Sequence, residues 1–347
     1  MHIPAFISEG LEVVAVCASR QERAQDAADT FSIPNIFTDY REMLNMESLD
    51  AVSIASPPAL HHQMAIDSLD AGKHVICEKP FALNQDEAYD MWKKAEGSEL
   101  TAMIAHEFRF ASARMRTKEL IREGYIGNLH MALISLANGP RNGFTPRTIT
   151  SRDYAEQGGG FLWALGSHYI DCLRDWFGNI ISVTGHVQTH YGERINQDDD
   201  GVINATSDDA FTFTVQFEQG GLATMNGTNA APFGSGAKVE IYGSDGTLIT
   251  PHVGTGVNPP AHGSLLGANK GDKQLEGISI PDRLETVTDD RDDRIGPFRL
   301  LVREFIKGVN EGYSPTPNFY DGYKCQQVLD AVRVSSKTGV RIKIPMD

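Results

Sequence analysis

Residues 72–80 read Gly72-Lys-His-Val-Ile-Cys-Glu-Lys-Pro80 and place a lysine directly after a short apolar strand. Pro80 lacks a backbone donor and biases Lys79 toward extended geometry, so the strand ends here and the direction of the lysine is fixed. Ligands collect at the carboxyl ends of the strands in an open parallel α/β sheet. We therefore predict that Lys79 lies at a ligand-binding edge, where its ammonium group can polarise a substrate hydroxyl or carbonyl. A solvated lysine at a strand end is the alternative.

The residues before this stretch have the pattern of a β-α-β unit. Residues 50–55 are a short apolar segment that Ser56-Pro57-Pro58 interrupts. Residues 59–71 then carry apolar side chains at helical spacing, and Gly72 follows where a helix C-cap is expected. The pattern predicts a strand, a helix and a second strand that ends at Lys79.

Strands and helices alternate along the whole first part of the chain. Such alternation predicts a parallel, doubly wound sheet, which we assign to a domain over residues 1–107. The expected strands are residues 11–17, 35–38, 50–55 and 100–105, together with the short strand that ends just before Glu78. The expected helices are residues 21–31, 40–46, 59–71 and 85–95.

A different pattern begins after residue 107 and predicts a second, α+β domain over residues 108–347. Long segments of alternating apolar and polar residues, joined by glycine turns, indicate a large, mostly antiparallel open sheet with one buried face. We interpret the Gly-, Pro- and charge-rich residues 251–294 as a surface loop. The expected strands are residues 128–136, 181–189, 210–218, 222–228, 238–242 and 247–250, and the expected helices are 113–123 and 159–177.

The overall composition limits the possible partners. The net charge is −15 and the pI about 5.2, which disfavours binding to nucleic acid or to anionic membrane surfaces. No segment approaches the ~20 apolar residues of a membrane span. The four cysteines are scattered without metal-ligand spacing, so we expect no metal site and a reducing, cytoplasmic location.

Several motifs at fixed spacing together resemble one known family. Pro57, His61, Ala71-Gly72-Lys73-His74-Val75 and Glu78-Lys79-Pro80 are similar to the first signature of the glucose-fructose oxidoreductase / inositol dehydrogenase / rhizopine catabolism (Gfo/Idh/MocA) family. The glycine-run segment Gly158–Asp171 resembles its second signature, and residues 321–330 with 341–345 resemble its closing helix and strand. The resemblance implies an NAD(P)-dependent oxidoreductase that acts on a sugar, polyol or related cyclic alcohol.

The resemblance also implies which residues take part in catalysis and substrate binding. Lys79 would stabilise a developing alkoxide, and His168 would transfer the hydroxyl proton, because an imidazole pKa of about 6.5 suits this task. Arg109, Trp163 and Asp171 are the candidate substrate-binding residues. A structural histidine, an exposed salt bridge at Arg109, a core Trp163 and a surface Asp171 are the respective alternatives.

Seven residues are candidate contacts of the cofactor. The expected second strand ends in Ala18-Ser19-Arg20 without the acidic residue that binds the ribose of NAD, and an arginine there can accommodate a 2′-phosphate. This favours NADP, with NAD as the alternative, although Arg20 could also be a solvated residue at the start of a helix. The other candidates for cofactor binding are Ser56, Pro57, His61, Glu78 and Lys79, with His61 as a possible surface histidine instead.

The chain departs from the family pattern in two places. Ala164 stands where the family commonly has aspartate, which removes a carboxylate at i−4 from His168. The first strand of the sheet and a GxGxxG phosphate loop are missing before residue 11, because Met1-His-Ile-Pro-Ala-Phe6 resembles the middle of the first helix. We expect that the complete enzyme starts upstream and that this sheet lacks its first strand.

Two further functions remain open, and both use the same fold. The departures favour a non-catalytic sugar or nucleotide sensor, whereas Lys79, His168 and Asp171 oppose it. The same residues could also support glycoside cleavage with tightly held NAD. For any of the three, the resemblance implies a homodimer or homotetramer through the open sheet of the second domain.

Overall fold

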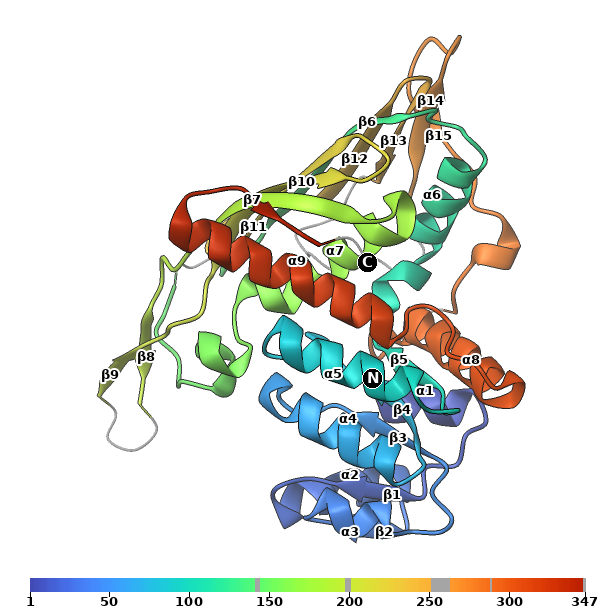
Figure 1. The fold of residues 1–347 in the computed structure, drawn as a ribbon, viewed down its shortest axis with the longest axis vertical. Helices are drawn as coiled ribbons and strands as arrows, with labels where there is room; N and C mark the ends of the chain where they lie inside the picture. Colours follow the sequence, from blue (N-terminus) through green and yellow to red (C-terminus); the bar gives the residue numbers. More distant parts are fainter. Residues whose placement is uncertain (141–143, 197–200, 251–262, 288, 346–347) are drawn as a thin grey trace. The chain divides into compact units, whose positions relative to one another are not determined.

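The computed structural model describes residues 1–140, 144–196, 201–250, 263–287 and 289–345. The chain divides into two compact units, shown in Figure 1. Unit 1 consists of residues 1–107 and 289–323, and unit 2 consists of residues 108–288 and 324–347. The C-terminal helix α9 (Phe319–Thr338) contributes residues to both.

The parallel strands of unit 1 form two separate sheets. Short apolar strands alternate with helices here, and both sheets are parallel as the alternation predicts. One sheet has the order β1-β2 and the other the order β3-β4-β5. The strands are β1 (Ala15–Cys17), β2 (Asn35–Phe37), β3 (Ala51–Ile54), β4 (His74–Cys77) and β5 (Ala102–Ile104).

Burial differs between the strands of the two sheets. Every residue of β1 is partly exposed, and so are three of the four residues of β3, whereas β5 is fully buried. Among the described residues, no further strand pairs with β1 or β3. β1 and β3 are therefore edge strands of their sheets within the described residues.

The helices of unit 1 cover these strands, and several contacts join the beginning of the chain to a much later segment. The ring of His2 lies 4.3 Å from the ring of Phe298, centroid to centroid, and Glu9 accepts hydrogen bonds from Arg299 and Arg303. The helices are α1 (His2–Ser8), α2 (Gln21–Phe31), α3 (Tyr40–Leu44), α4 (His61–Asp70), α5 (Gln85–Glu96) and α8 (Ile295–Glu311).

Unit 2 contains one continuous nine-stranded sheet in the order β15-β14-β13-β12-β6-β11-β10-β7-β16. Among the described strands of this sheet, only the β6–β11 pair is parallel, which confirms the prediction of a mostly antiparallel sheet. The strands are β6 (Leu129–Ala137), β7 (Ile180–Gln188), β10 (Ala210–Phe217), β11 (Leu222–Thr228), β12 (Gly236–Gly243), β13 (Gly246–Thr250), β14 (Leu266–Asn269), β15 (Glu276–Gly277) and β16 (Ile342–Lys343); β8 (Glu193–Ile195) and β9 (Val202–Asn204) form a separate hairpin.

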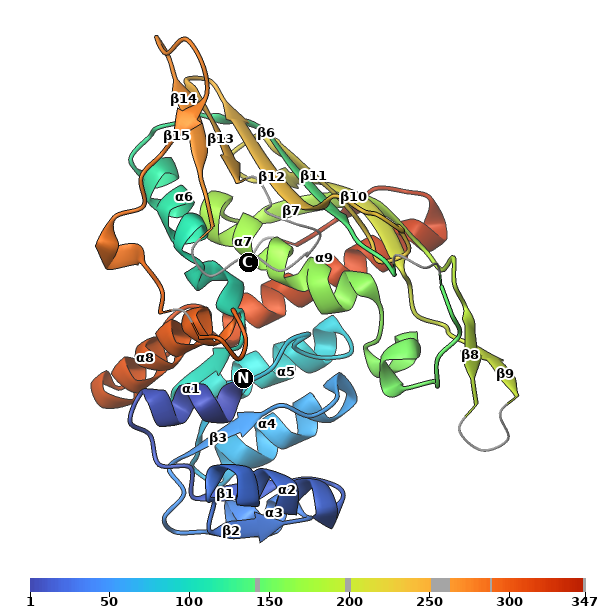
Figure 2. The ribbon, with the colours of Figure 1, turned by 180° about the vertical axis from the view of Figure 1, so that it is seen from behind.

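Helices cover one face of this large sheet. In Figures 1 and 2, α6 (Ser112–Arg122), α7 (Ser167–Phe177) and the later part of α9 lie on the same side of it. The alternating strand residues that point to this side form one core with the apolar residues of α7 and α9. The opposite face carries polar side chains such as Thr212 and Lys238 and two exposed apolar ones, Met131 and Leu222.

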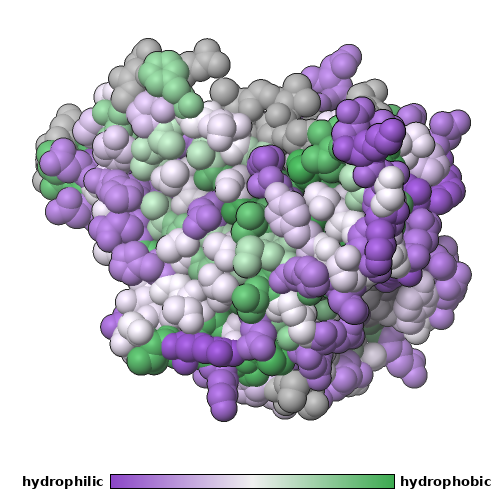
Figure 3. Space-filling view, turned by 90° about the horizontal axis from the view of Figure 1, so that it is seen from above, coloured by the Kyte–Doolittle hydropathy of each residue, from purple (hydrophilic) through white to green (hydrophobic). Residues whose placement is uncertain are grey.

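A view from above shows the surface on the side of this sheet (Figure 3). Neutral and apolar residues lie among polar ones in the middle of the view, and strongly hydrophilic residues gather toward its margins.

Two expectations about secondary structure need correction. The interpretation of residues 251–294 as loop is wrong for β14 and β15, because β14 pairs with the edge of β13 and extends the sheet; residues 251–262 and 288 lie outside the described residues. The helix expected over 159–177 is not α-helical throughout. It begins with a π-helix over Leu162–Gly166 and continues as α7.

Candidate functional site

The carboxyl ends of β3, β4 and β5 bring several predicted site residues to one edge of unit 1. The amide of Glu78 donates to the carbonyl of Ile54 (2.8 Å), and the amide of Ala105 donates to the carbonyl of Cys77 (2.8 Å). These bonds continue the parallel pairing past the strand ends. Lys79 therefore leaves the sheet at the carboxyl edge, as predicted from Glu78-Lys79-Pro80.

Glu78 is held in place by a histidine at the beginning of the chain. His2 contacts the carboxylate of Glu78 through Nε2 (2.8 Å) and the hydroxyl of Ser53 through Nδ1 (2.7 Å). Burial tends to raise the pKa of Glu78, but the hydrogen bond and charge of His2 and the charge of Lys79 lower it to about 2. Glu78 is therefore ionised at neutral pH.

A second carboxyl at this edge, Glu107, was not among the predicted site residues. It follows β5 and is 1% exposed. Burial and the neighbouring charge of Glu78 raise the pKa of Glu107 to about 8, against the opposing effect of Lys79. A buried glutamate three residues after a strand is a weak signal in a sequence, because its neighbours Glu78 and Lys79 are brought close only by the fold.

His61 is an internal residue, which excludes the alternative of a surface histidine. It is 1% exposed, with Nδ1 beside the carbonyl of Pro80 (3.0 Å) and Nε2 beside the carbonyl of Ser56 (2.9 Å). Burial lowers the pKa of His61 although these carbonyls oppose the effect. His61 thus contacts both the loop after β3 and the loop after β4, although the neutral ring can donate a hydrogen bond to only one of the two carbonyls.

The remaining cofactor candidates also lie just after strand ends. Ser19 and Arg20 are exposed between β1 and α2, and Arg20 is the N-cap residue of α2. Pro57 is the N-cap residue of a short 3₁₀ turn. The hydroxyl of Ser56 is buried and has no hydrogen-bond partner among the described residues.

The glycine run of unit 2 allows a close approach of two chain segments. Gly160 has φ +122°, and a Cβ atom there would lie 2.3 Å from Oδ1 of Asp208. Asp208 accepts a hydrogen bond from the amide of Leu162 (2.8 Å), and burial raises its pKa to about 6. Asp208 thus supports the start of the π-helix, a role that the sequence did not indicate.

The π-helix leads directly into the turn that carries His168. His168 is 2% exposed, and its ring stacks on Phe108 at 3.8 Å between centroids with an interplanar angle of 9°. π-helical turns often occur at functional sites. Ala164 is the single exposed residue between Phe161 and Ile170, so the position of the missing carboxylate is open to solvent.

Arg109 and Asp171 form a buried ion pair, so neither is a surface residue. Nε and Nη2 of Arg109 donate to the two carboxylate oxygens of Asp171 at 2.6 and 2.7 Å, and Nη1 donates to Asp175 at 3.1 Å. Lys118 also donates to Asp175 (2.6 Å). The side chain of Arg109 is 6% exposed and that of Asp171 is 0% exposed, so the exposed salt bridge considered from the sequence is excluded.

Trp163 lies in the core of unit 2 with a partly buried cation, Arg333, above its ring. It is fully buried, and Cζ of Arg333 lies 3.5 Å from the centre of its ring. Another arginine, Arg114, is buried; it donates to Sγ of Cys172 and lies 4.3 Å from the ring centre of Tyr169. Both arginines were missed, because neither belongs to a motif.

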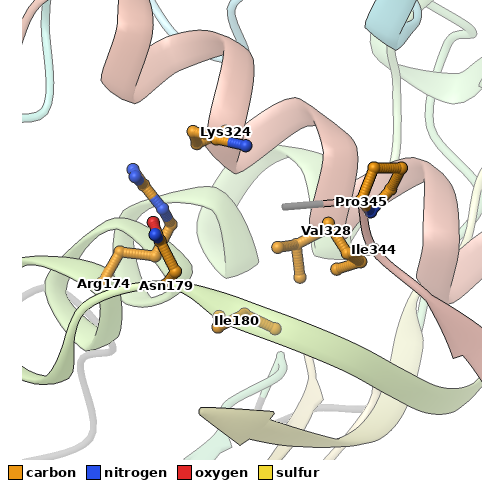
Figure 4. A pocket seen from close by; sticks show the side chains of 7 residues that line it. All are labelled: Arg174, Asn179, Ile180, Lys324, Val328, Ile344 and Pro345. Carbon is orange, nitrogen blue, oxygen red and sulfur yellow. The ribbon is translucent and has the colours of Figure 1, made fainter. Parts of the chain in front are cut away.

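A small pocket in unit 2 contains none of the predicted site residues. Figure 4 shows polar side chains on one side and apolar ones on the other. Its lining is formed by Arg174, Asn179, Ile180, Lys324, Val328, Ile344 and Pro345. Within the described residues, no group of three or more His, Cys, Asp or Glu side chains is placed to hold a metal ion.

Two family models match almost the whole chain. Residues 1–106 match a model described as "Oxidoreductase family, NAD-binding Rossmann fold", and residues 118–344 match one described as "Oxidoreductase family, C-terminal alpha/beta domain". Both models carry the Gfo/Idh/MocA name, so the resemblance stated from the sequence is confirmed.

Individual relatives are similar over nearly their full length. An uncharacterized oxidoreductase of Synechocystis sp. is 27% identical over 99% of this chain and 93% of its own. The D-glucoside 3-dehydrogenase of Escherichia coli is 26% identical over 96% and 90%. Among solved structures, levoglucosan dehydrogenase in complex with NADH and L-sorbose has a TM-score of 0.89 at 22% identity, covering 100% of this chain and 95% of that one.

In the described parts of the chain, no helix combines the length and the apolar character needed to cross a membrane.

Proposed function

Because the chain belongs to the Gfo/Idh/MocA oxidoreductase family, with its NAD-binding Rossmann fold in the first part of the chain, we propose that it oxidises or reduces a sugar, polyol or related cyclic alcohol. The reaction is the transfer of a hydride between the nicotinamide of NAD(P) and a CH–OH group. The observation that carries the proposal is the placement of Glu78-Lys79 at the carboxyl edge of the β3-β4-β5 sheet, where ligands of such folds bind.

The described residues of unit 1 fit part of a dinucleotide. Ser56 offers a buried hydroxyl without a partner at the end of β3, and His61, Glu78 and Lys79 lie at the same edge. These groups would hold the ribose and nicotinamide portion. Ser19 and Arg20 after β1 would contact the adenosine portion, which favours NADP with NAD as the alternative.

Lys79 supplies the positive charge in this proposal. When bound, a nicotinamide supplies the hydride acceptor or donor. The ammonium group of Lys79 would stabilise negative charge that develops on the substrate oxygen, an effect that is strong in a water-poor site. Glu78, fixed by His2, keeps the strand end in place and holds its carboxylate beside Lys79.

His168 is the proposed group for proton transfer. Its ring is fixed against Phe108, so its orientation is set before substrate binds. Both carboxylate oxygens of Asp171 accept hydrogen bonds from Arg109. We assign to this ion pair the role of holding the substrate-binding residues of unit 2 in position. Trp163, fully buried, would shape that surface from behind.

Relatives support the class of substrate. The curated proteins similar to this chain include a levoglucosan dehydrogenase and a D-glucoside 3-dehydrogenase, and the solved structures include a levoglucosan dehydrogenase with bound NADH. We assign dinucleotide binding to residues 1–107 and substrate binding to residues 108–347. The open face of the nine-stranded sheet is the proposed surface for a homodimer or homotetramer, in a cytoplasmic protein without nucleic-acid or membrane partners.

The test is a screen for turnover with NAD and NADP against levoglucosan, alkyl glucosides and inositols. Wild-type protein is expected to reduce one cofactor with at least one of these alcohols, and Lys79→Ala or His168→Ala is expected to lower kcat by 10²-fold or more. Lys270→Ala and His130→Ala are matched controls, because both side chains are exposed in unit 2. Equal loss in the controls, or no effect of either site variant, would contradict the assignment.

A non-catalytic sugar or nucleotide sensor is the second candidate. The alanine at position 164, where the family commonly has aspartate, favours it. A sensor would bind sugar or nucleotide without reducing added cofactor. Cleavage of aryl glycosides without net cofactor reduction would instead indicate the NAD-dependent glycoside-cleaving alternative.

A further inference from the structure

We propose that Glu107 is a further positioning residue for the reaction and that its buried carboxyl sets the net charge around Lys79. The kinetic consequence of this inference rests on the proposed oxidoreductase function. The charge coupling itself belongs to unit 1 and can be measured without turnover.

The geometry places the two side chains at neighbouring strand ends. Lys79 stands two residues after β4, and Glu107 three residues after β5. The amide of Ala105 donates to the carbonyl of Cys77, so the two strands stay paired up to this edge. Glu107 is 1% exposed and lies within electrostatic range of both Glu78 and Lys79. Its charge therefore acts on Lys79 with little screening by solvent.

Charged groups face Glu107 from two other parts of unit 1. Glu78, which contacts His2 of α1, favours the protonated form of Glu107, and so does burial. Lys79 and Arg294 oppose this, and Arg294 at the start of α8 is in turn bonded to Asp292. Burial and Glu78 prevail, which raises the pKa of Glu107 and makes it a neutral acid at neutral pH.

The two states of Glu107 give Lys79 different surroundings. With Glu107 protonated, the charges of Glu78, Lys79 and Glu107 sum to zero. When Glu107 releases its proton to solvent, the sum becomes −1, and a second carboxylate competes for the field of the ammonium group. An alkoxide that develops beside Lys79 is then stabilised less, so we expect kcat to fall as the pH rises through the titration of Glu107.

The kinetic experiment compares pH profiles of kcat from pH 6 to 10 for wild-type protein, Glu107→Gln and Glu99→Gln. Glu99 is an exposed carboxyl of the same unit and serves as the matched control. We expect Glu107→Gln to lose the basic limb near pH 8, while Glu99→Gln keeps it. A limb that persists unchanged in Glu107→Gln overturns the proposal.

A direct titration makes the proposal independent of turnover. In protein with ¹³C-labelled glutamate carboxyls, one signal that is absent from Glu107→Asp should titrate above pH 7. Lys79→Gln should move its titration to higher pH, because the neighbouring cation that lowers the pKa of Glu107 has gone. A Glu107 signal that titrates near pH 4, or one that Lys79→Gln leaves unchanged, overturns the inference. Titration as expected without turnover of any substrate would refute the proposed function alone.

Discussion

The two units hold their candidate site residues in position by different means. In unit 1, short strands in two sheets leave partly exposed edges, and Glu78, Lys79 and Glu107 are arranged by charge and burial at one rim. In unit 2, one nine-stranded sheet and a single large core surround a stacked histidine and a buried ion pair. His168, the proposed proton-transfer residue, is therefore fixed by packing. The electrostatic effect of Lys79, the proposed charge-stabilising residue, depends instead on the ionisation of its neighbours.

The largest expected effect comes from breaking the buried ion pair of unit 2. Asp171→Ala removes both oxygens that accept from Nε and Nη2 of Arg109 and keeps the hydrogen bond from Nη1 to Asp175. Loss of one partner of a buried pair costs about 4 kcal/mol in the free energy of unfolding. Hydrogen exchange resolved by peptide should show the loss in residues 108–288. Asp245→Ala, which removes a carboxylate that is 46% exposed, is the control. Equal losses of stability in the two variants would contradict a structural role of the buried ion pair in unit 2.

The next effect tests the close approach of the glycine run to Asp208. Gly160→Ala combines a positive φ with a Cβ atom placed 2.3 Å from Oδ1 of Asp208, and we expect a loss of about 3 kcal/mol in stability. Gly220→Ala is the matched variant, because Gly220 has φ +94° and nothing within 4 Å of the added atom. It should lose about 1 kcal/mol from backbone strain alone. Equal losses in chemical denaturation would show that the contact with Asp208 has no structural role.

A third expected effect is a pH-dependent stability of unit 1 that arises from Glu78. Because the pKa of Glu78 in the folded protein is lowered to about 2, its ionised form stabilises unit 1 above the usual glutamate range. This contribution is lost as the pH falls from about 4.5 toward 2. Glu78→Gln should lower stability by about 2 kcal/mol at pH 7 and by little at pH 2, since it weakens a charged hydrogen bond to His2. Hydrogen exchange in residues 1–107 at several pH values measures the stability difference between Glu78→Gln and wild type. A difference that does not vary with pH would contradict the proposed role of the ionised carboxylate.

The smallest effect on stability is expected at Ala164. Its side chain is exposed, so Ala164→Asp should change stability by less than about 0.5 kcal/mol. A carboxylate four residues before His168 adds a negative charge that favours the protonated imidazole, so the acidic limb of the pH profile of kcat should shift upward. Ala164→Asn is the uncharged control. An identical shift in both variants would show that charge at this position does not act on His168.

Much of the fold followed from periodicity. The helix expected over residues 21–31 and the strand over 222–228 match α2 and β11 to the residue. Apolar alternation and glycine turns are local signals, and they suffice for such elements. Strands β14 and β15 were missed, because their pairing depends on the edge of β13 and their own sequence is rich in glycine and charge.

The candidate residues were found unevenly for similar reasons. Lys79 and His168 stand in motifs, so the sequence indicated them, and their catalytic roles remain predictions. Glu107, Asp208 and Arg114 belong to no motif, and what sets them apart is burial beside charged or aromatic groups. Such surroundings arise from segments far apart in the chain. Nothing in the sequence indicated that residues 289–323 cluster with residues 1–107.

The central claim is that this chain is a nicotinamide-dependent oxidoreductase, and a fluorescence titration of the folded protein with NADPH and NADH tests it most directly. We predict binding with a Kd in the micromolar range, which corresponds to a binding free energy of about −8 kcal/mol, and tighter binding of NADPH through contacts of Ser19 and Arg20 with its 2′-phosphate. Replacing Arg20 by Ala should weaken the binding of NADPH more than the binding of NADH. A folded sample that binds neither cofactor would contradict the claim.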